Sequence, residues 1–211
     1  MIELYHCPDA RSFRALWTLE ELELPYELHL LPFPPRVRAP DYLKINPLGT
    51  IPALIDGDTF MTESAAIVQY LVTRYGPTEL AVTPDDPSYG AWLNWLHFGE
   101  ATLTFPQTLV LRYRTFEPGR ADAAADDYAR WFLSRLKHVD RALAEAEWLC
   151  AGRFTAADIS VGYALLLANH LKLLASASPA IHAYWERLKA RPAFQAAKRA
   201  QKADLAEALS S

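Results

Sequence analysis

The N-terminal third of the chain alternates strand patterns with one clear helical pattern. Apolar and polar residues alternate over Ile2–Tyr5, which predicts a half-buried strand. From Arg11 to Leu24 the apolar residues recur at helical spacing with charged residues between them, and Tyr26–Leu31 predicts a second strand. A strand, a helix and a strand in this order imply a parallel strand pair.

A proline-rich segment separates this unit from a predicted hairpin. Pro32–Pro40 contains four prolines and is expected to form a loop. Ala53–Asp56 predicts a third strand that ends at an Asp-Gly turn, and Thr59–Thr62 predicts a short antiparallel return strand. A helix is expected to follow from Glu63 to Tyr75.

The rest of the chain has only helical patterns. The segment 77–87 is rich in proline and acidic residues and predicts a linker. We therefore expect an α/β domain at 1–76 and an all-helical domain at 88–211. The expected helices begin near Trp92 and then span Asp126–Trp148, Asp158–Leu174, Pro179–Ala190 and Pro192–Ala208.

Composition narrows the class of protein. Of 211 residues, 51% are hydrophobic and the formal net charge is −4, which is typical of a folded globular chain. A protein that neutralises phosphates needs a basic surplus, so no nucleic-acid partner is expected. The longest uncharged apolar stretch, Ile159–Leu171, is shorter than the ~20 residues of a membrane span, and no secretory signal pattern opens the chain.

Cysteine and histidine usage predicts neither disulfides nor a metal site. Cys7 and Cys150 lie far apart and form no disulfide framework, which favours a cytoplasmic location. Neither the cysteines nor the histidines have the paired spacing of metal ligands. No glycine-rich nucleotide-binding pattern is present either.

Four motifs are more specific than the periodicity. They are Asn46–Leu54 (NPLGTIPAL), Glu63–Ile67 (ESAAI), Leu4–Leu22 (LYHCPDARSFRALWTLEEL) and Thr155–Asp158 (TAAD). Together they resemble the cytosolic glutathione transferases, and a bacterial-type member among them. The resemblance implies a thioredoxin-like N-terminal domain followed by an all-α helical bundle. It also implies a transferase with a role in detoxification, glutathione as co-substrate, and a homodimer.

The first two motifs carry the implied glutathione site. By resemblance, the bond before Pro52 is cis, and the backbone of Ile51 pairs with the cysteinyl part of glutathione as an added strand would. Taken alone, Pro52 is an ordinary turn proline. The helix beginning at Glu63 and Ser64 would attract a carboxylate, while Glu63 would hold an ammonium group, which matches the γ-glutamyl end. A plain helix cap is the alternative interpretation.

The group that activates the thiol is the open question. Many serine-type relatives have a hydroxyl four positions before the residue matching Arg14, and here that position is Ala10. Ser12 is the first candidate hydroxyl, and Tyr5 is another. Cys7 begins a Cys-Pro-x-Ala sequence that resembles the cysteine-type relatives, although it also fits a small buried hydrophobe. We expect the helix arginines to be solvated or structural rather than catalytic.

The acceptor is expected to be a small, apolar electrophile. Its predicted site is lined by the first long helix of the second domain, with Phe98, Thr104, Phe105 and Tyr113 as the main candidates and His97, Glu100, Ala101 and Phe116 beside them. Two alternatives stay open: a Cys7-dependent thiol–disulfide or dehalogenating enzyme, and a scaffold that binds ligands or proteins without turnover. Thr155 and Asp158 match a capping box, and loss of Asp158 is expected to cost about 0.5–2 kcal/mol.

Overall fold

The computed structural model describes residues 1–208, and side chains are described up to residue 202. It divides into two compact units. One unit comprises Met1–Thr78 together with the chain from Lys189 onward, and the other comprises Glu79–Leu188. In the part of the chain that is described, no helix is long and apolar enough to cross a membrane.

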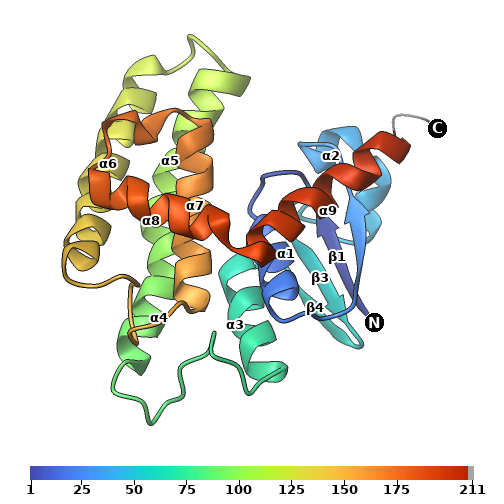
Figure 1. Ribbon diagram of the computed structural model, residues 1–211. Helices are drawn as coiled ribbons and strands as arrows, with labels where there is room; N and C mark the ends of the chain where they lie inside the picture. The colour runs from blue at the N-terminus through green and yellow to red at the C-terminus, as the bar shows by residue number, and fades with distance from the viewer. Residues whose placement is uncertain (209–211) are drawn as a thin grey trace. The chain divides into compact units, whose positions relative to one another are not determined.

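A four-stranded mixed sheet forms the centre of the first unit (Figure 1). The strand order is β2-β1-β3-β4; β1 and β2 are parallel, and β3 is antiparallel to both β1 and β4. The predicted parallel pair and return hairpin are confirmed, and this topology with its helices is the thioredoxin-like arrangement. The strands are β1 (Ile2–His6), β2 (Tyr26–Leu30), β3 (Ala53–Asp56) and β4 (Thr59–Met61).

Two helices cover this sheet with their apolar residues. In α1 (Phe13–Glu21) every residue from Phe13 to Leu19 is buried, and α3 (Ser64–Arg74) buries Ile67 and Leu71. Hydrophobic burial at these helical positions is the main force that fixes the two helices in place. The proline-rich segment contains two short helical turns where the sequence predicted only a loop, α2 (Pro35–Arg38) and the 3-10 turn η1 (Pro40–Lys44).

The C-terminal helix α9 (Pro192–Ala208) packs in the first unit, beside α1 (Figure 1). Phe194 makes edge contacts with the rings of Phe13 and Trp17, at centroid distances of 5.3 and 5.0 Å. Arg191, which directly precedes α9, forms a paired ion bridge with Glu21 at 2.6 and 2.7 Å. The expectation of one continuous helical domain to residue 211 thus differs from the structure, because an amphipathic pattern shows that a helix has a buried face but not what covers it.

The second unit is entirely helical. A long helical stretch runs through α4 (Tyr89–His97), the π-helical segment η2 (Phe98–Thr104), α5 (Phe105–Leu111) and the π-helical segment η3 (Arg112–Phe116). It is followed by α6 (Asp122–Glu145), α7 (Ala156–His170), the 3-10 turn η4 (Leu173–Ser176) and α8 (Pro179–Ala190), whose last two residues join the first unit.

Close approach between α7 and the first π-helical segment requires a glycine. A Cβ at Gly99 would lie 2.4 Å from the Ser160 hydroxyl oxygen, which is closer than any real contact. That hydroxyl donates a hydrogen bond to the carbonyl of Leu96 at 2.6 Å. The π-helical geometry and the missing side chain thus let the two helices pack at this point.

The start of α7 is held by a buried carboxylate. The capping box of Thr155 and Asp158 is present, as the sequence predicted. One Asp158 oxygen also accepts from the Leu149 N–H at 3.2 Å and from the Tyr184 hydroxyl at 2.8 Å. Burial raises the pKa of Asp158 to about 6, although the hydrogen bonds from Thr155, Leu149 and Tyr184 oppose the shift. Asp158 therefore organises two further parts of the bundle as well as the cap.

We expect Asp158→Ala to lower the free energy of unfolding by about 3–5 kcal/mol, more than a lost cap alone, because buried donors on three residues lose their acceptor. Asp122→Ala is the matched control, since Asp122 lies in the first turn of α6 and accepts one exposed bond, from the Gly119 N–H. That change should cost less than about 1 kcal/mol. Urea denaturation of both variants measures the difference, and equal losses would contradict the structural role assigned to Asp158.

Candidate functional site

The turn before β3 is held by side chains that bond to its backbone. The Asn46 amide and the Tyr42 hydroxyl both donate to the carbonyl of Thr50, at 2.8 and 2.7 Å. Gly49 has a φ of +60°, and a Cβ there would lie 2.5 Å from the Arg36 Cβ, so a glycine is required. These contacts fix the direction in which the chain enters Ile51.

Ile51 has unused backbone hydrogen-bonding groups. The bond between Ile51 and Pro52 is cis, as the resemblance implies. The Ile51 side chain packs in an apolar cluster with Cys7, Tyr42 and Ala53. Within the described residues, neither its N–H nor its C=O has a hydrogen-bond partner. Such a pair of groups is what an extended peptide needs in order to add as a strand.

The strand register connects this turn with the start of α3. The β3–β4 ladder pairs Leu54 with Met61. Pro52 directly precedes β3, and only Thr62 and Glu63 lie between β4 and α3, so both segments adjoin this end of the hairpin. The two motifs that the sequence assigned to glutathione therefore meet at one end of the same hairpin.

A buried cation lies behind the α3 N-terminus. Ser64 is buried, and its hydroxyl accepts a hydrogen bond from Arg14 Nη1 at 3.1 Å. Arg14 is fully buried in α1, so its role is structural and electrostatic rather than solvated. Glu63, the residue before α3, is exposed with an extended backbone. A helix N-terminus with a guanidinium behind it favours a carboxylate, while the exposed Glu63 carboxylate favours an ammonium group.

The two side chains predicted to activate the thiol are both buried. The Ser12 hydroxyl oxygen accepts from the Cys7 N–H at 3.3 Å and lies 3.5 Å from the Cys7 carbonyl. The Cys7 thiol faces the carbonyl of Pro32 at 3.8 Å, and burial raises its pKa to about 12. In this conformation Ser12 closes the loop that it belongs to, and Cys7 is a core side chain. Neither side chain is exposed in this conformation, and a catalytic role for either stays a prediction.

Between Cys7 and Ser12 the chain is partly exposed, and we call this segment the Pro8–Arg11 loop. Ala10 packs against the apolar cluster that contains Ile51, so the loop and the turn before β3 are neighbours. Tyr5 also packs against that cluster, and its ring stacks on His29 at 4.4 Å. Burial raises the Tyr5 pKa, which disfavours its phenolate. The partly exposed loop carries two charged side chains, Asp9 and Arg11.

A hollow of about 470 Å³ lies on the helical unit. Phe98, one of the predicted acceptor-site residues, lines it, together with Leu93, Asn94, His97, Ala101 and Thr102. The other predictions fall elsewhere. Thr104 is buried and donates to the Gly99 carbonyl at 2.7 Å, while the exposed Phe105 contacts the Tyr128 ring and the ring of Tyr113 lies near Arg112. Thr104 therefore stabilises the π-helical segment.

Sequence reasoning missed three contributions to this site. Asn46 and Tyr42 hold the turn, and the NPLGTIP motif itself was the available signal for Asn46. Arg14 supports Ser64, but no pattern links α1 to α3 before the fold is known. Within residues 1–202, no group of three or more His, Cys, Asp or Glu side chains is placed to hold a metal ion.

Comparisons with known proteins agree with this geometry. Residues 4–79 match the family described as Glutathione S-transferase, N-terminal domain. Glutathione S-transferase 3 of Schizosaccharomyces pombe is 30% identical over 182 residues, covering 80% of this chain and 75% of that protein. Glutathione S-transferase GstB of Escherichia coli is 31% identical over 188 residues, covering 86% and 89%.

The same relationship is found among solved structures. A glutathione transferase from Phanerochaete chrysosporium, crystallised in complex with oxidized glutathione, superposes with a TM-score of 0.84 at 29% identity. The match covers 95% of this chain and 96% of that one. The chain belongs to the glutathione S-transferase family.

Proposed function

We propose that the protein is a glutathione transferase that binds glutathione and transfers its thiolate to a small, apolar electrophile. The observation that carries this proposal is the pair of Ile51 backbone groups that have no hydrogen-bond partner among the described residues, at the end of the hairpin from which the chain enters α3. Glutathione has the complementary chemistry, with a central peptide unit that can pair with Ile51 and a γ-glutamyl end with both an ammonium and a carboxylate.

In this proposal the γ-glutamyl carboxylate binds at the α3 N-terminus and the Ser64 hydroxyl, with the buried charge of Arg14 behind them. Glu63 pairs with the ammonium group. These charge-assisted bonds hold the tripeptide by one end, and the pairing at Pro52 and Ile51 orients its middle. The sulfur then lies toward the Pro8–Arg11 loop, because Ala10 and Ile51 share one cluster.

We assign activation of the thiol to the backbone at the start of α1. A free thiol with a pKa of ~8.5 needs stabilisation of its thiolate at neutral pH. The positive end of the helix dipole provides such stabilisation. Ala10 supplies no hydroxyl, and the Ser12 hydroxyl is engaged with Cys7. The attack then forms a carbon–sulfur bond, and the leaving group departs with the electron pair of its bond to carbon.

The alternative chemistry through Cys7 has less support. A cysteine that attacks a disulfide must reach the ligand as a thiolate. Cys7 is fully buried and its pKa is raised to about 12, so both requirements fail in this conformation. A scaffold without turnover is favoured by one observation only, the alanine at position 10.

We further propose that the acceptor binds at the hollow lined by Phe98, that the protein is a homodimer, and that it is cytoplasmic. The hollow has apolar and polar lining residues, which suits a small electrophile with an apolar body. The dimer and the location rest on membership of the family.

Binding to immobilised glutathione tests the γ-glutamyl site. Glu63→Ala and Ser64→Ala should each weaken retention at least about tenfold, because each removes a hydrogen-bonding partner of a charged group. Ser88→Ala, at the residue before α4, is the matched control and should bind as the wild type does. If both site variants are retained like the control, the γ-glutamyl end is not bound there.

Conjugation to an aromatic electrophile separates backbone activation from side-chain activation. With backbone activation, Cys7→Ala and Ser12→Ala should each keep kcat/KM within about tenfold of the wild type, whereas loss of a direct donor to the reacting atom costs about 100-fold or more. Cys150→Ala, at the other buried cysteine, is the control for Cys7→Ala. A 100-fold loss of kcat/KM in Ser12→Ala, with glutathione binding intact, would indicate that the Ser12 hydroxyl activates the thiol. Absence of turnover in the wild type, with tight glutathione binding, would favour the scaffold.

A further inference from the structure

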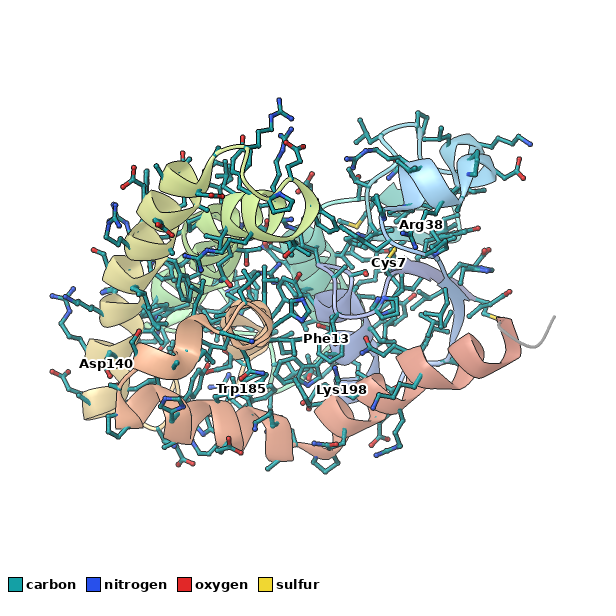
Figure 2. All side chains as sticks on the ribbon, turned by 90° about the horizontal axis from the view of Figure 1, so that it is seen from above. Cys7, Phe13, Arg38, Asp140, Trp185 and Lys198 are labelled. Carbon is teal, nitrogen blue, oxygen red and sulfur yellow. The ribbon has the colours of Figure 1, made fainter. Side chains whose placement is uncertain are left out.

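The C-terminal helix contacts the loop that faces the proposed thiol site. The anchoring residue Phe194, with Ala197 and Gln201, forms one buried face of α9 at helical spacing. Phe194 packs on α1, and Lys198 lies with its ammonium 5.8 Å from the centre of the Phe13 ring. Figure 2 shows Lys198 close to Phe13 in this view. The helix therefore reaches the loop at Gln201, two turns beyond Phe194.

Gln201 and Lys198 hold Asp9 at both its backbone and its side chain. The Gln201 amide oxygen accepts from the Asp9 N–H at 3.2 Å, and its amide nitrogen donates to Asp9 Oδ1 at 2.7 Å. Lys198 donates to the same carboxylate oxygen at 2.6 Å. If the Gln201 amide were rotated by 180°, its NH2 group would face the Asp9 N–H, and two donors would oppose each other. The hydrogen bonds to Asp9 therefore determine the orientation of the Gln201 amide.

His6 completes the network from β1. Its Nε2 lies 3.1 Å from the Gln201 amide oxygen, which only accepts, so Nε2 carries the proton. Nδ1 is buried and, in the described part of the chain, has no hydrogen-bond partner. Burial lowers the pKa of His6 to about 4, so the ring stays neutral at physiological pH. Gln201 thus joins three elements, β1, the loop and α9.

The backbone conformation of Asp9 is the reason that these hydrogen bonds from Gln201 and Lys198 matter. Asp9 has a φ of +55°, in the left-handed region that non-glycine residues rarely adopt. A single residue in this region redirects the peptide units that follow it, here those of Ala10 and Arg11 before α1 begins. Asp9 is a carboxylate beside a site proposed to hold a thiolate, and Lys198 offsets that negative charge.

We propose that Lys198 and Gln201 are positioning residues for the proposed glutathione reaction: through Asp9 they hold the Pro8–Arg11 loop in the conformation that presents the start of α1 to the glutathione thiol. This inference rests on the proposed function. The C-terminal helix α9 thus contributes to activation of the thiol, in addition to its packing against α1.

The test measures kcat/KM for the electrophile between pH 5.5 and 9, with glutathione saturating. Its pH dependence reports the ionisation of the thiol in the enzyme–glutathione complex. The ionisable groups facing Asp9 are His6 on β1 and Lys198 on α9. His6 is neutral throughout this range. Burial alone would raise the Asp9 pKa, but the bonds from Lys198 and Gln201 and the nearby charges lower it, so Asp9 stays ionised. The midpoint therefore reports the thiol.

Gln201→Met keeps the length of the side chain but removes its hydrogen bonds to Asp9. We expect the midpoint to rise by about one pH unit, so that kcat/KM falls about tenfold below the midpoint and approaches the wild-type value at high pH. Affinity for S-methylglutathione, which has no ionisable thiol, should stay within about threefold of the wild type. Gln195→Met, on an exposed side of the same helix, is the matched control and should leave both measurements unchanged.

Lys198 provides a second test if Gln201→Met does not fold, since Lys198 is only half-buried. Lys198→Met should raise the midpoint, and Lys198→Arg should restore it by keeping the ion pair with Asp9. An unchanged midpoint in the folded variants overturns the inference, and so does an equal loss of affinity for glutathione and S-methylglutathione. If the wild type itself binds no S-methylglutathione, the proposed function fails and the inference falls with it, which separates the two failures.

Discussion

The peptide groups of Ile51 need hydrogen-bond partners, and the described part of the chain supplies none to them. An unsatisfied backbone donor and acceptor at a strand end carry a free-energy cost that water or a ligand must remove. The surrounding residues keep the Ile51 N–H and C=O accessible to a ligand. Asn46 and Tyr42 donate to the carbonyl of Thr50, and the Ile51 side chain packs with Cys7 and Ala53. A ligand with an extended peptide backbone is therefore matched to the site before any side chain is considered.

Charge then selects among the peptides that could pair there. Arg14 is a fully buried cation on α1. Its bond to Ser64 directs this positive charge to the α3 N-terminus, where the helix dipole has the same sign. A ligand carboxylate at that point interacts with both, while the exposed Glu63 disfavours a second negative charge and favours an adjacent ammonium. In the proposed function, this is the reason that a γ-glutamyl end suits the site better than a simple acid.

Much of this arrangement could be predicted from the sequence because it depends on local signals. The Asp56-Gly57 turn fixes the hairpin, and helical periodicity fixes α1, α3 and α7. The cis bond before Pro52, implied by the resemblance, is also present. What could not be predicted depends on contacts far apart in the chain: the bond between Arg14 and Ser64, and the covering of α1 by α9. A hydroxyl or thiol at a helix start has the same sequence whether it faces a ligand or its own backbone.

The alanine at position 10 and the hydrogen bonds around Asp9 act on the same loop. When a side-chain hydroxyl activates a thiol, rotation about its own bonds can correct small errors in the backbone. Backbone groups have no such freedom, so their direction must be set by the chain itself. A loop that relies on backbone dipoles therefore needs external support, particularly where a residue such as Asp9 has a left-handed conformation. Gln201 and Lys198 provide that support from the far end of the sequence, and Ser12 closes the loop from the other side. In the proposed function, the alanine at position 10, the burial of the Ser12 hydroxyl and the docking of α9 are therefore connected.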